Sequence, residues 1–208
     1  KFGVAGLGLI GTSIAQGVAT GFAKAVVGYD PDRAARNSAL ASMTTVTNRL
    51  DDLHGSDVIV LAAPPGQILD LIAQIAEWND DNATVTDVAS VKSAIVGCVP
   101  MSLRPRFIPG HPMAGLEATG SNLARAEIFH GAHWVLCPFP ETSDDRFHTV
   151  RAMVRHLRAL PVLMDAENHD RHVALLSHLP HVLANVIALA VLPGVVGRPG
   201  SHADEHAE

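Results

Sequence analysis

Three glycines near the start of the sequence, Gly6, Gly8 and Gly11, have the Gly-x-Gly-x-x-Gly spacing of a turn that binds phosphate groups. In such a turn the first glycine permits a tight bend, the second lets the backbone approach an anion, and the third lets a helix pack closely on a strand. The helix that follows directs its unpaired N–H groups at the anion. Because glycine-rich turns are common, the spacing alone leaves a purely structural turn open as the alternative to a dinucleotide site.

An acidic residue follows at the distance that a dinucleotide site requires. Asp30 comes nineteen positions after the last of these glycines and ends an apolar run at residues 25–29. A carboxylate there accepts hydrogen bonds from the ribose hydroxyls of NAD and would repel the 2′-phosphate of NADP. The sequence therefore favours NAD, a preference that Arg33 and Arg36 could soften. The alternative role for Asp30 is to cap a helix whose first turn contains Pro31.

The turn needs a strand before it and a helix after it, and the sequence supplies both. Residues 2–5 form a short apolar run, and an alanine-rich amphipathic stretch follows from residue 9 to about 22. Further strands are expected at residues 44–47, 57–62, 84–88, 106–109 and 134–136, and further helices at 31–42, 64–78 and 91–99. This alternation predicts an α/β fold of the Rossmann type, with a doubly wound parallel sheet.

Several candidate residues come where an expected strand ends: Asp30, Pro64, residues 87–90 and His111. The carboxyl ends of parallel strands lie at one edge of the sheet, where ligands bind, so we expect these residues to converge on one crevice. An imidazole there can accept a proton near neutral pH. The residue type alone explains His111 equally well as a general base or as an ordinary loop histidine.

Beyond residue 142 the sequence changes to helical patterns. Residues 144–160 predict an amphipathic helix, and a long, mostly apolar helical pattern spans 166–192. Pro180 should interrupt that second helix, and Pro193 with Gly194 should end it. We expect a dinucleotide-binding domain at residues 1–142, the start of a truncated all-helical substrate and dimerisation domain at 143–196, and a disordered tail at 197–208.

The histidines of this helical stretch allow two interpretations. His178 and His181 are three residues apart, so they share one face of a helix and could contact a ligand. With His169 and His172 they form two His-x-x-His pairs, for which a metal site is the alternative. The pairs are separated by about two turns of helix, too far along the axis to complete one site, so we expect no metal.

The composition argues against several classes of protein. A formal net charge of −6 gives no electrostatic reason to expect nucleic acid or an anionic membrane surface, and no apolar run reaches the length of a membrane-spanning helix. The chain opens on a strand pattern with no signal-like segment. Two distant cysteines, Cys98 and Cys137, imply no disulfide framework. We therefore expect a cytoplasmic protein that acts on a small molecule.

Four local patterns occur in a fixed order along the chain. They are Gly6-Leu7-Gly8-Leu9-Ile10-Gly11-Thr12-Ser13, Thr86-Asp87-Val88-Ala89-Ser90-Val91-Lys92, Gly110-His111-Pro112-Met113-Ala114-Gly115-Leu116-Glu117 and His169-Asp170-x-x-Val173-Ala174-x-x-Ser177-His178-Leu179-Pro180-His181. Together they resemble the prephenate/arogenate dehydrogenase family of tyrosine biosynthesis, and the resemblance covers the chain up to about residue 192. The last two patterns are much more specific than the glycine turn.

The resemblance implies an NAD-dependent oxidative decarboxylation of prephenate to 4-hydroxyphenylpyruvate. It implies that His111 accepts the proton of the ring hydroxyl, that Ser90 hydrogen-bonds this histidine near the nicotinamide, and that Lys92 is structural or electrostatic. A Ser90 that merely caps the next helix is the alternative. The residues implied to bind substrate are Ser177, His178 and His181, and those implied to bind cofactor are Gly6, Gly8, Leu9, Ile10, Gly11, Asp30, Pro64 and Ser90.

The sequence also departs from the family pattern. It ends before a downstream arginine that pairs with a substrate carboxylate and before the remaining helices of the dimer interface, although a homodimer through the helical domain is still expected. Arogenate, with NAD or NADP, is the closest alternative substrate. The alternative to an active enzyme is an inactive nucleotide-binding fragment of such an enzyme. A 3-hydroxyacid dehydrogenase would use a lysine on the helical domain, and the chain has none after Lys92.

Overall fold

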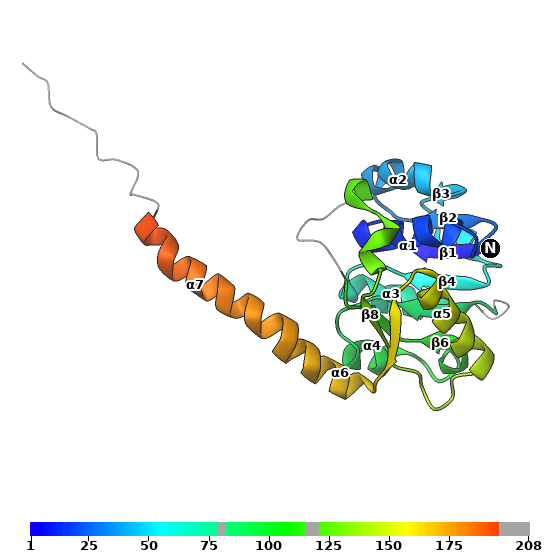
Figure 1. The fold of residues 1–208 in the computed structure, drawn as a ribbon. Coiled ribbons are helices and arrows are strands. Elements are labelled where there is room, and N and C mark those ends of the chain that lie inside the picture. Colours follow the sequence, from blue (N-terminus) through cyan, green and yellow to red (C-terminus); the bar gives the residue numbers. More distant parts are fainter. Residues whose placement is uncertain (79–81, 115–120, 196–208) are drawn as a thin grey trace, which may run out of the picture. The chain divides into compact units, whose positions relative to one another are not determined.

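The structure is a computed structural model that describes residues 1–78, 82–114 and 121–195 (Figure 1). Its contacts divide the chain into two compact units, Lys1–Asp170 and Arg171–Glu208, which are described separately below. The division of the chain into domains at residues 142 and 196 stays a prediction. The tail predicted to be disordered, 197–208, lies outside the described residues.

The first unit is built on a six-stranded sheet in which every pair of neighbours is parallel. Its strands, in spatial order, are β3 (Thr45–Thr47), β2 (Val26–Tyr29), β1 (Phe2–Ala5), β4 (Val58–Leu61), β5 (Thr84–Asp87) and β6 (Phe107–Ile108). The order confirms the predicted doubly wound Rossmann-type sheet. From β1 the chain adds β2 and β3 on one side and then β4, β5 and β6 on the other side. The carboxyl ends of β1 and β4 therefore define the switch point at which such folds bind ligands.

Helices cover both faces of this sheet. They are α1 (Leu9–Ala19), α2 (Arg33–Ala39), α3 (Pro65–Ala76), α4 (Ser93–Cys98) and α5 (Asp144–His156). Strand β4 shows the consequence for sequence: Val58 and Val60 belong to the core under α1, α2 and α5, whereas Ile59 and Leu61 belong to the core under α3 and α4. All four side chains are buried, which explains the continuous apolar run of this strand.

A second, three-stranded sheet corrects one prediction. Strand β8 (His133–Leu136) is antiparallel to β7 (Gly110–Pro112) and parallel to β9 (Leu160–Leu163), and it does not extend the main sheet. His111 follows the carboxyl end of β6 by three residues and itself lies within β7, opposite Val135. Pro109 separates β6 from β7: it has no N–H for a ladder, and its carbonyl oxygen accepts the Cys137 N–H at 2.8 Å.

The helical part begins with α6 (Ala166–Val173), which crosses the boundary between the two units, and continues in the second unit. A π-helical stretch, Ala174–His178, comes directly before α7 (Leu179–Val195). Pro180 is the second residue of α7 and comes directly after this π-helical stretch, so the regular α-helical pattern is interrupted where the proline cannot donate an N–H. The prediction that Pro193 and Gly194 end the helix is wrong, because α7 runs through both to Val195. Among the described helices, none combines the length and hydropathy of a membrane span.

The remaining short helices are 3₁₀ turns in connections of the first unit. They span Leu40–Ser42, Leu50–Leu53, Arg104–Arg106, Ser121–Leu123 and Ala126–Phe129. Helix α5 is shorter than predicted, because Arg158 adopts a left-handed φ of 58° just beyond it and the chain enters β9 at Leu160. A residue other than glycine in this conformation gives no signal in the sequence.

Candidate active site

The turn after β1 has the geometry that its glycines predict. Gly6 has a φ of 100°, and a Cβ on it would lie 2.4 Å from the carbonyl oxygen of Ala62. A Cβ on Gly11 would lie 2.0 Å from the carbonyl oxygen of Gly6, so close packing of α1 requires a glycine there. A Cβ on Gly8 would meet none of the described atoms within 4 Å. The first and third glycines thus serve the fold, whereas the second borders open space.

A cavity of about 400 Å³ opens beside this turn at the switch point. Its lining includes Gly6, Gly8, Asp30 and Pro64, which brings together four of the residues predicted to bind cofactor. Leu9 and Ile10 form the first turn of α1 and are half-buried. The N-cap of α1 is Gly8, so no side chain of the cap competes with a ligand for the N-terminal N–H groups of the helix.

Asp30 fixes the turn to the start of the next helix. Its Oδ2 accepts the Leu7 N–H at 2.8 Å, and its Oδ1 accepts the Asp32 N–H at 2.8 Å. Asp32, and not Asp30, caps α2, by accepting the Ala34 N–H at 3.0 Å. Each carboxylate oxygen of Asp30 has a second lone pair with which to accept a ligand hydroxyl. Asp30 can therefore hold the turn and face the cavity at once.

Arg36, one of the two arginines that follow Asp30, is hydrogen-bonded to backbone carbonyls. Arg36 donates from Nη1 to the carbonyl oxygens of Asp30, at 2.7 Å, and Pro31, at 2.9 Å. The effect of Arg33 and Arg36 on the preference for NAD stays a prediction.

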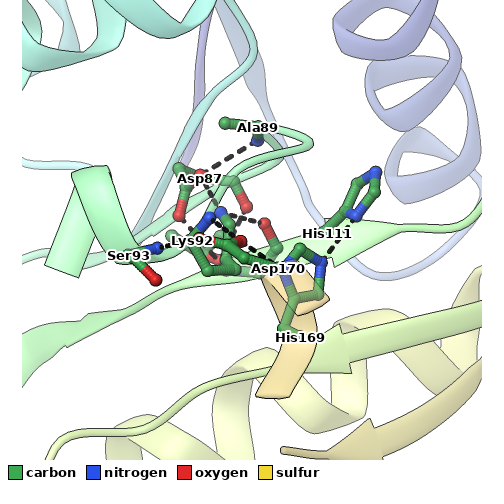
Figure 2. Close-up of polar contacts among 9 residues, drawn as sticks. Asp87, Ala89, Lys92, Ser93, His111, His169 and Asp170 are labelled. Carbon is green, nitrogen blue, oxygen red and sulfur yellow. Dashed lines mark hydrogen bonds and ion pairs between the residues drawn. The ribbon is translucent and has the colours of Figure 1, made fainter. Parts of the chain in front are cut away.

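A buried ion pair lies at the carboxyl end of β5 (Figure 2). The Lys92 ammonium donates to the Asp87 carboxylate and, at 2.6 Å, to the carbonyl oxygen of Gly110, the residue before His111. Asp87 also accepts the N–H groups of Ala89, at 2.9 Å, and Gly110, at 3.2 Å. Burial raises the pKa of Asp87, and Lys92 with these backbone donors opposes that rise. The pair ties β5 to β7, as expected of a structural lysine.

Beside this pair, His111 begins a line of three hydrogen-bonded side chains (Figure 2). Nδ1 of His111 lies 2.9 Å from Nε2 of His169, and Nδ1 of His169 lies 2.8 Å from Oδ1 of Asp170. His169 is almost fully buried, with 1% of its surface exposed, whereas His111 is half-buried. The sequence indicated no contact of His169 and Asp170 with His111, so this line is the part of the site that sequence reasoning missed.

Asp170 also caps the N-terminus of α4. Its two oxygens accept the N–H groups of Lys92, at 2.7 Å, and Ser93, at 2.8 Å. Helix α4 thus begins at Ser93, two residues later than predicted, and Asp170 takes the capping role considered for Ser90. Ser90 is exposed in the loop between β5 and α4, and its hydrogen bond to His111 stays a prediction.

The predicted substrate-binding residues cannot be assessed in the same way. Ser177 and His178 lie in the π-helical stretch and His181 lies in α7, but their side chains are outside what the structure describes. Their role stays a prediction. In the described part of the chain, no three side chains of His, Cys, Asp or Glu gather as a metal ion would require.

Comparison with known proteins points to one family. The sequence model of the nucleotide-binding domain of prephenate dehydrogenase matches residues 17–163. The prephenate dehydrogenase of Lactococcus lactis is 31% identical over 194 residues, which cover 90% of this chain and 52% of that protein. The chain thus spans about half the length of this curated relative.

Two solved structures have the same fold. The prephenate dehydrogenase of Aquifex aeolicus, in complex with hydroxyphenyl propionate and NAD⁺, has a TM-score of 0.86 and 26% identity, covering 95% of this chain and 70% of that one. The arogenate dehydrogenase of Synechocystis has a TM-score of 0.80 and 29% identity, covering 96% of this chain and 70% of that one. Since the family model alone matches more than half of its residues, the chain belongs to the prephenate dehydrogenase family.

Proposed function

We propose that this chain is the nucleotide-binding part of an NAD-dependent prephenate dehydrogenase. The observation that carries the proposal is the joint presence, in one unit, of a dinucleotide turn with Asp30 at its cavity and of a half-buried histidine whose Nδ1 is held by His169. The family match and the relative crystallised with NAD⁺ and hydroxyphenyl propionate support it. Hydroxyphenyl propionate carries the phenol that such a reaction forms.

The residues at the turn fit a dinucleotide. Gly8 borders open space where a pyrophosphate would approach the backbone, and the uncapped start of α1 supplies N–H donors. Asp30 offers acceptors for the adenosine ribose at the cavity. Bound NAD supplies the acceptor for the hydride that leaves the ring carbon.

His111 then performs the proton transfer. Its imidazole accepts the proton of the ring hydroxyl as the hydride leaves and the carbonyl forms. Cleavage of the bond between the ring and its carboxylate releases carbon dioxide and leaves the bonding electrons in the ring, which becomes a phenolate. His111 returns the proton to that oxygen, so the products are the phenol, carbon dioxide and the reduced cofactor, with no net proton left on the enzyme.

The role of the turn is tested by Gly8→Ala. Because a Cβ at this position meets no described atom within 4 Å, the variant should keep its thermal midpoint. A bound pyrophosphate would meet that methyl group, so the Kd for NAD should rise by about 10-fold or more, equivalent to about 1.4 kcal/mol. Gly97→Ala, where a Cβ also has open space, is the matched control and should leave the Kd unchanged. An unchanged Kd in Gly8→Ala, measured by calorimetry, would remove the turn from the binding site.

The preference for NAD is tested by Asp30→Ala. Loss of a hydrogen bond to a charged group should weaken NAD by about 10- to 100-fold. NADP should be weakened less, because the repulsion of its 2′-phosphate is lost at the same time. Asp51→Ala, an exposed carboxylate outside the cavity, controls for net charge. If both cofactors lose affinity equally in calorimetric titrations, Asp30 serves only to hold the turn.

Arogenate is the second candidate substrate, and the similarity to the Synechocystis arogenate dehydrogenase supports it. The two substrates differ in the side chain, which carries a keto acid in prephenate and an amino acid in arogenate. We propose prephenate as the preferred substrate. The test is a parallel assay of both compounds with NAD and NADP, following reduced cofactor; a higher kcat/KM for arogenate would reverse the assignment.

We also propose that the protein is a homodimer through its helical domain. Helix α7 exposes large apolar side chains, among them Val186 at 57%, Ile187 at 62% and Leu189 at 71%. Exposed apolar area of this extent is typical of an interface. Light scattering coupled to gel filtration should give twice the chain mass. A monomer that stays monodisperse at high concentration would contradict the dimer.

A further inference from the structure

The line His111–His169–Asp170 has a direction that follows from its donors and acceptors (Figure 2). Asp170 accepts two backbone N–H groups at the start of α4 and one imidazole N–H. Burial raises the pKa of its carboxyl, but hydrogen bonds from Ser93, from the backbone of Lys92 and from His169 outweigh this and lower the pKa to about 2. Asp170 is therefore an acceptor throughout the neutral range.

The positions of the protons on His169 and His111 follow from the role of Asp170 as an acceptor. Since Asp170 only accepts, Nδ1 of His169 carries the proton that forms the 2.8 Å bond. In a neutral imidazole the second nitrogen is then an acceptor, so Nε2 of His169 receives a proton from its neighbour. That neighbour, 2.9 Å away, is Nδ1 of His111. A neutral His111 with its proton on Nδ1 has the lone pair on Nε2.

We propose that His169 and Asp170 are positioning residues that hold His111 in the tautomer able to act as a base through Nε2. The inference rests on the proposed function, because it gives the proton acceptor of that reaction its orientation. When His111 takes up the substrate proton, the charge of Asp170 also stabilises the imidazolium through the intervening ring.

Lys92 connects this line to the buried ion pair. Its backbone N–H donates to Asp170, and its ammonium donates to the carbonyl oxygen of Gly110, which precedes His111 in β7. Lys92 thus anchors both Asp170, at one end of the line, and the strand that carries His111, at the other end. Because Asp170 also caps α4, a loss of activity in an Asp170 variant would not separate positioning from folding. The test needs a spectroscopic readout.

The primary experiment uses the unmodified chain without substrate. Two-bond ¹⁵N–¹H correlation spectra distinguish the two neutral tautomers of histidine, and a His111→Asn variant assigns the resonances of His111 by their loss. We expect His111 protonated at Nδ1 and His169 protonated at Nδ1. A spectrum in which His111 carries its proton on Nε2 would overturn the proposal without any variant having to fold.

The matched pair of variants is Asp170→Asn and Asp165→Asn. Asp165, at the start of α6, accepts from Asn168 and is outside the line, so its replacement should leave the tautomer and kcat unchanged. In Asp170→Asn the His111 signal should shift towards the Nε2-protonated form, and kcat should fall about 10- to 1,000-fold with a smaller change in KM. An unchanged tautomer in folded Asp170→Asn would show that the carboxylate only caps α4.

These readouts separate the inference from the proposed function. If neither prephenate nor arogenate is turned over, the function fails while the tautomer measurement still stands. If His111→Asn abolishes turnover but His111 is protonated at Nε2, the function survives and the positioning role fails.

Discussion

Replacing His111 by asparagine should lower kcat for prephenate by about 10²- to 10⁴-fold, the usual contribution of a general base. Asparagine keeps a side-chain amide close to the position of Nδ1, so the contact with His169, 2.9 Å in the native site, can be retained while the nitrogen at the Nε2 position is lost. The Kd for NAD should stay the same, because His111 is not among the residues that line the cavity at the turn. Steady-state kinetics and calorimetry measure the two effects independently.

The control for this variant is His130→Asn, which changes an exposed histidine at the end of a 3₁₀ turn. Its kcat should match that of the native chain. A His111→Asn enzyme that keeps its native rate would end the assignment of His111 as proton acceptor. A parallel loss of NAD affinity would instead indicate that β7 supports the cofactor cavity.

Replacing Lys92 by methionine should lower the free energy of unfolding by about 3–5 kcal/mol. Lys92 and Asp87 are both fully buried, so the variant leaves an uncompensated carboxylate in the core. It also removes the donor to the carbonyl oxygen of Gly110 and so loosens the tie between β5 and β7. Urea denaturation followed by circular dichroism measures the loss.

Two further variants show whether the loss of stability in Lys92→Met comes from the unpaired carboxylate of Asp87. Lys24→Met removes an exposed lysine and should change stability by less than about 0.5 kcal/mol. The double variant Asp87→Asn with Lys92→Met removes both charges and should recover part of the stability lost in the single variant. Equal stabilities of Lys92→Met and the native chain would mean that the pair contributes nothing to folding.

Much of the fold could be predicted from the sequence because its central strands are covered on both faces. Residues 58–61 are apolar throughout since alternate side chains enter different cores, and such runs separated by helical patterns predict a doubly wound sheet. The second sheet could not be predicted in this way. Its strands pair across long separations, Gly110 with Leu136 and Leu136 with Leu163, and the sequence alone does not specify which short strands meet.

The residues of the site also divide into those that local sequence predicts and those whose contacts depend on tertiary structure. The glycine turn and Asp30 depend on local spacing, and the structure brings these residues to one cavity. The contacts of His111 with His169 and of Asp170 with Ser93, the first residue of α4, join residues 58 and 77 positions apart. The adjacent His-Asp pair at the start of a helix was visible in the sequence, but its direction towards His111 depends on tertiary structure. The start of α4 was predicted two residues too early for the same reason, because its N–H groups are bound by the distant Asp170.

The most direct test of the proposed chemistry is a crystal structure of this protein with NAD⁺ and hydroxyphenyl propionate. We predict that Nε2 of His111 lies within about 2.6–3.2 Å of the phenolic oxygen, the distance over which a general base acts. The same structure should show the pyrophosphate against Gly8 and the adenosine ribose on Asp30. An imidazole of His111 that faces away from the nucleotide, or a ligand hydroxyl bound by a different side chain, would contradict the account.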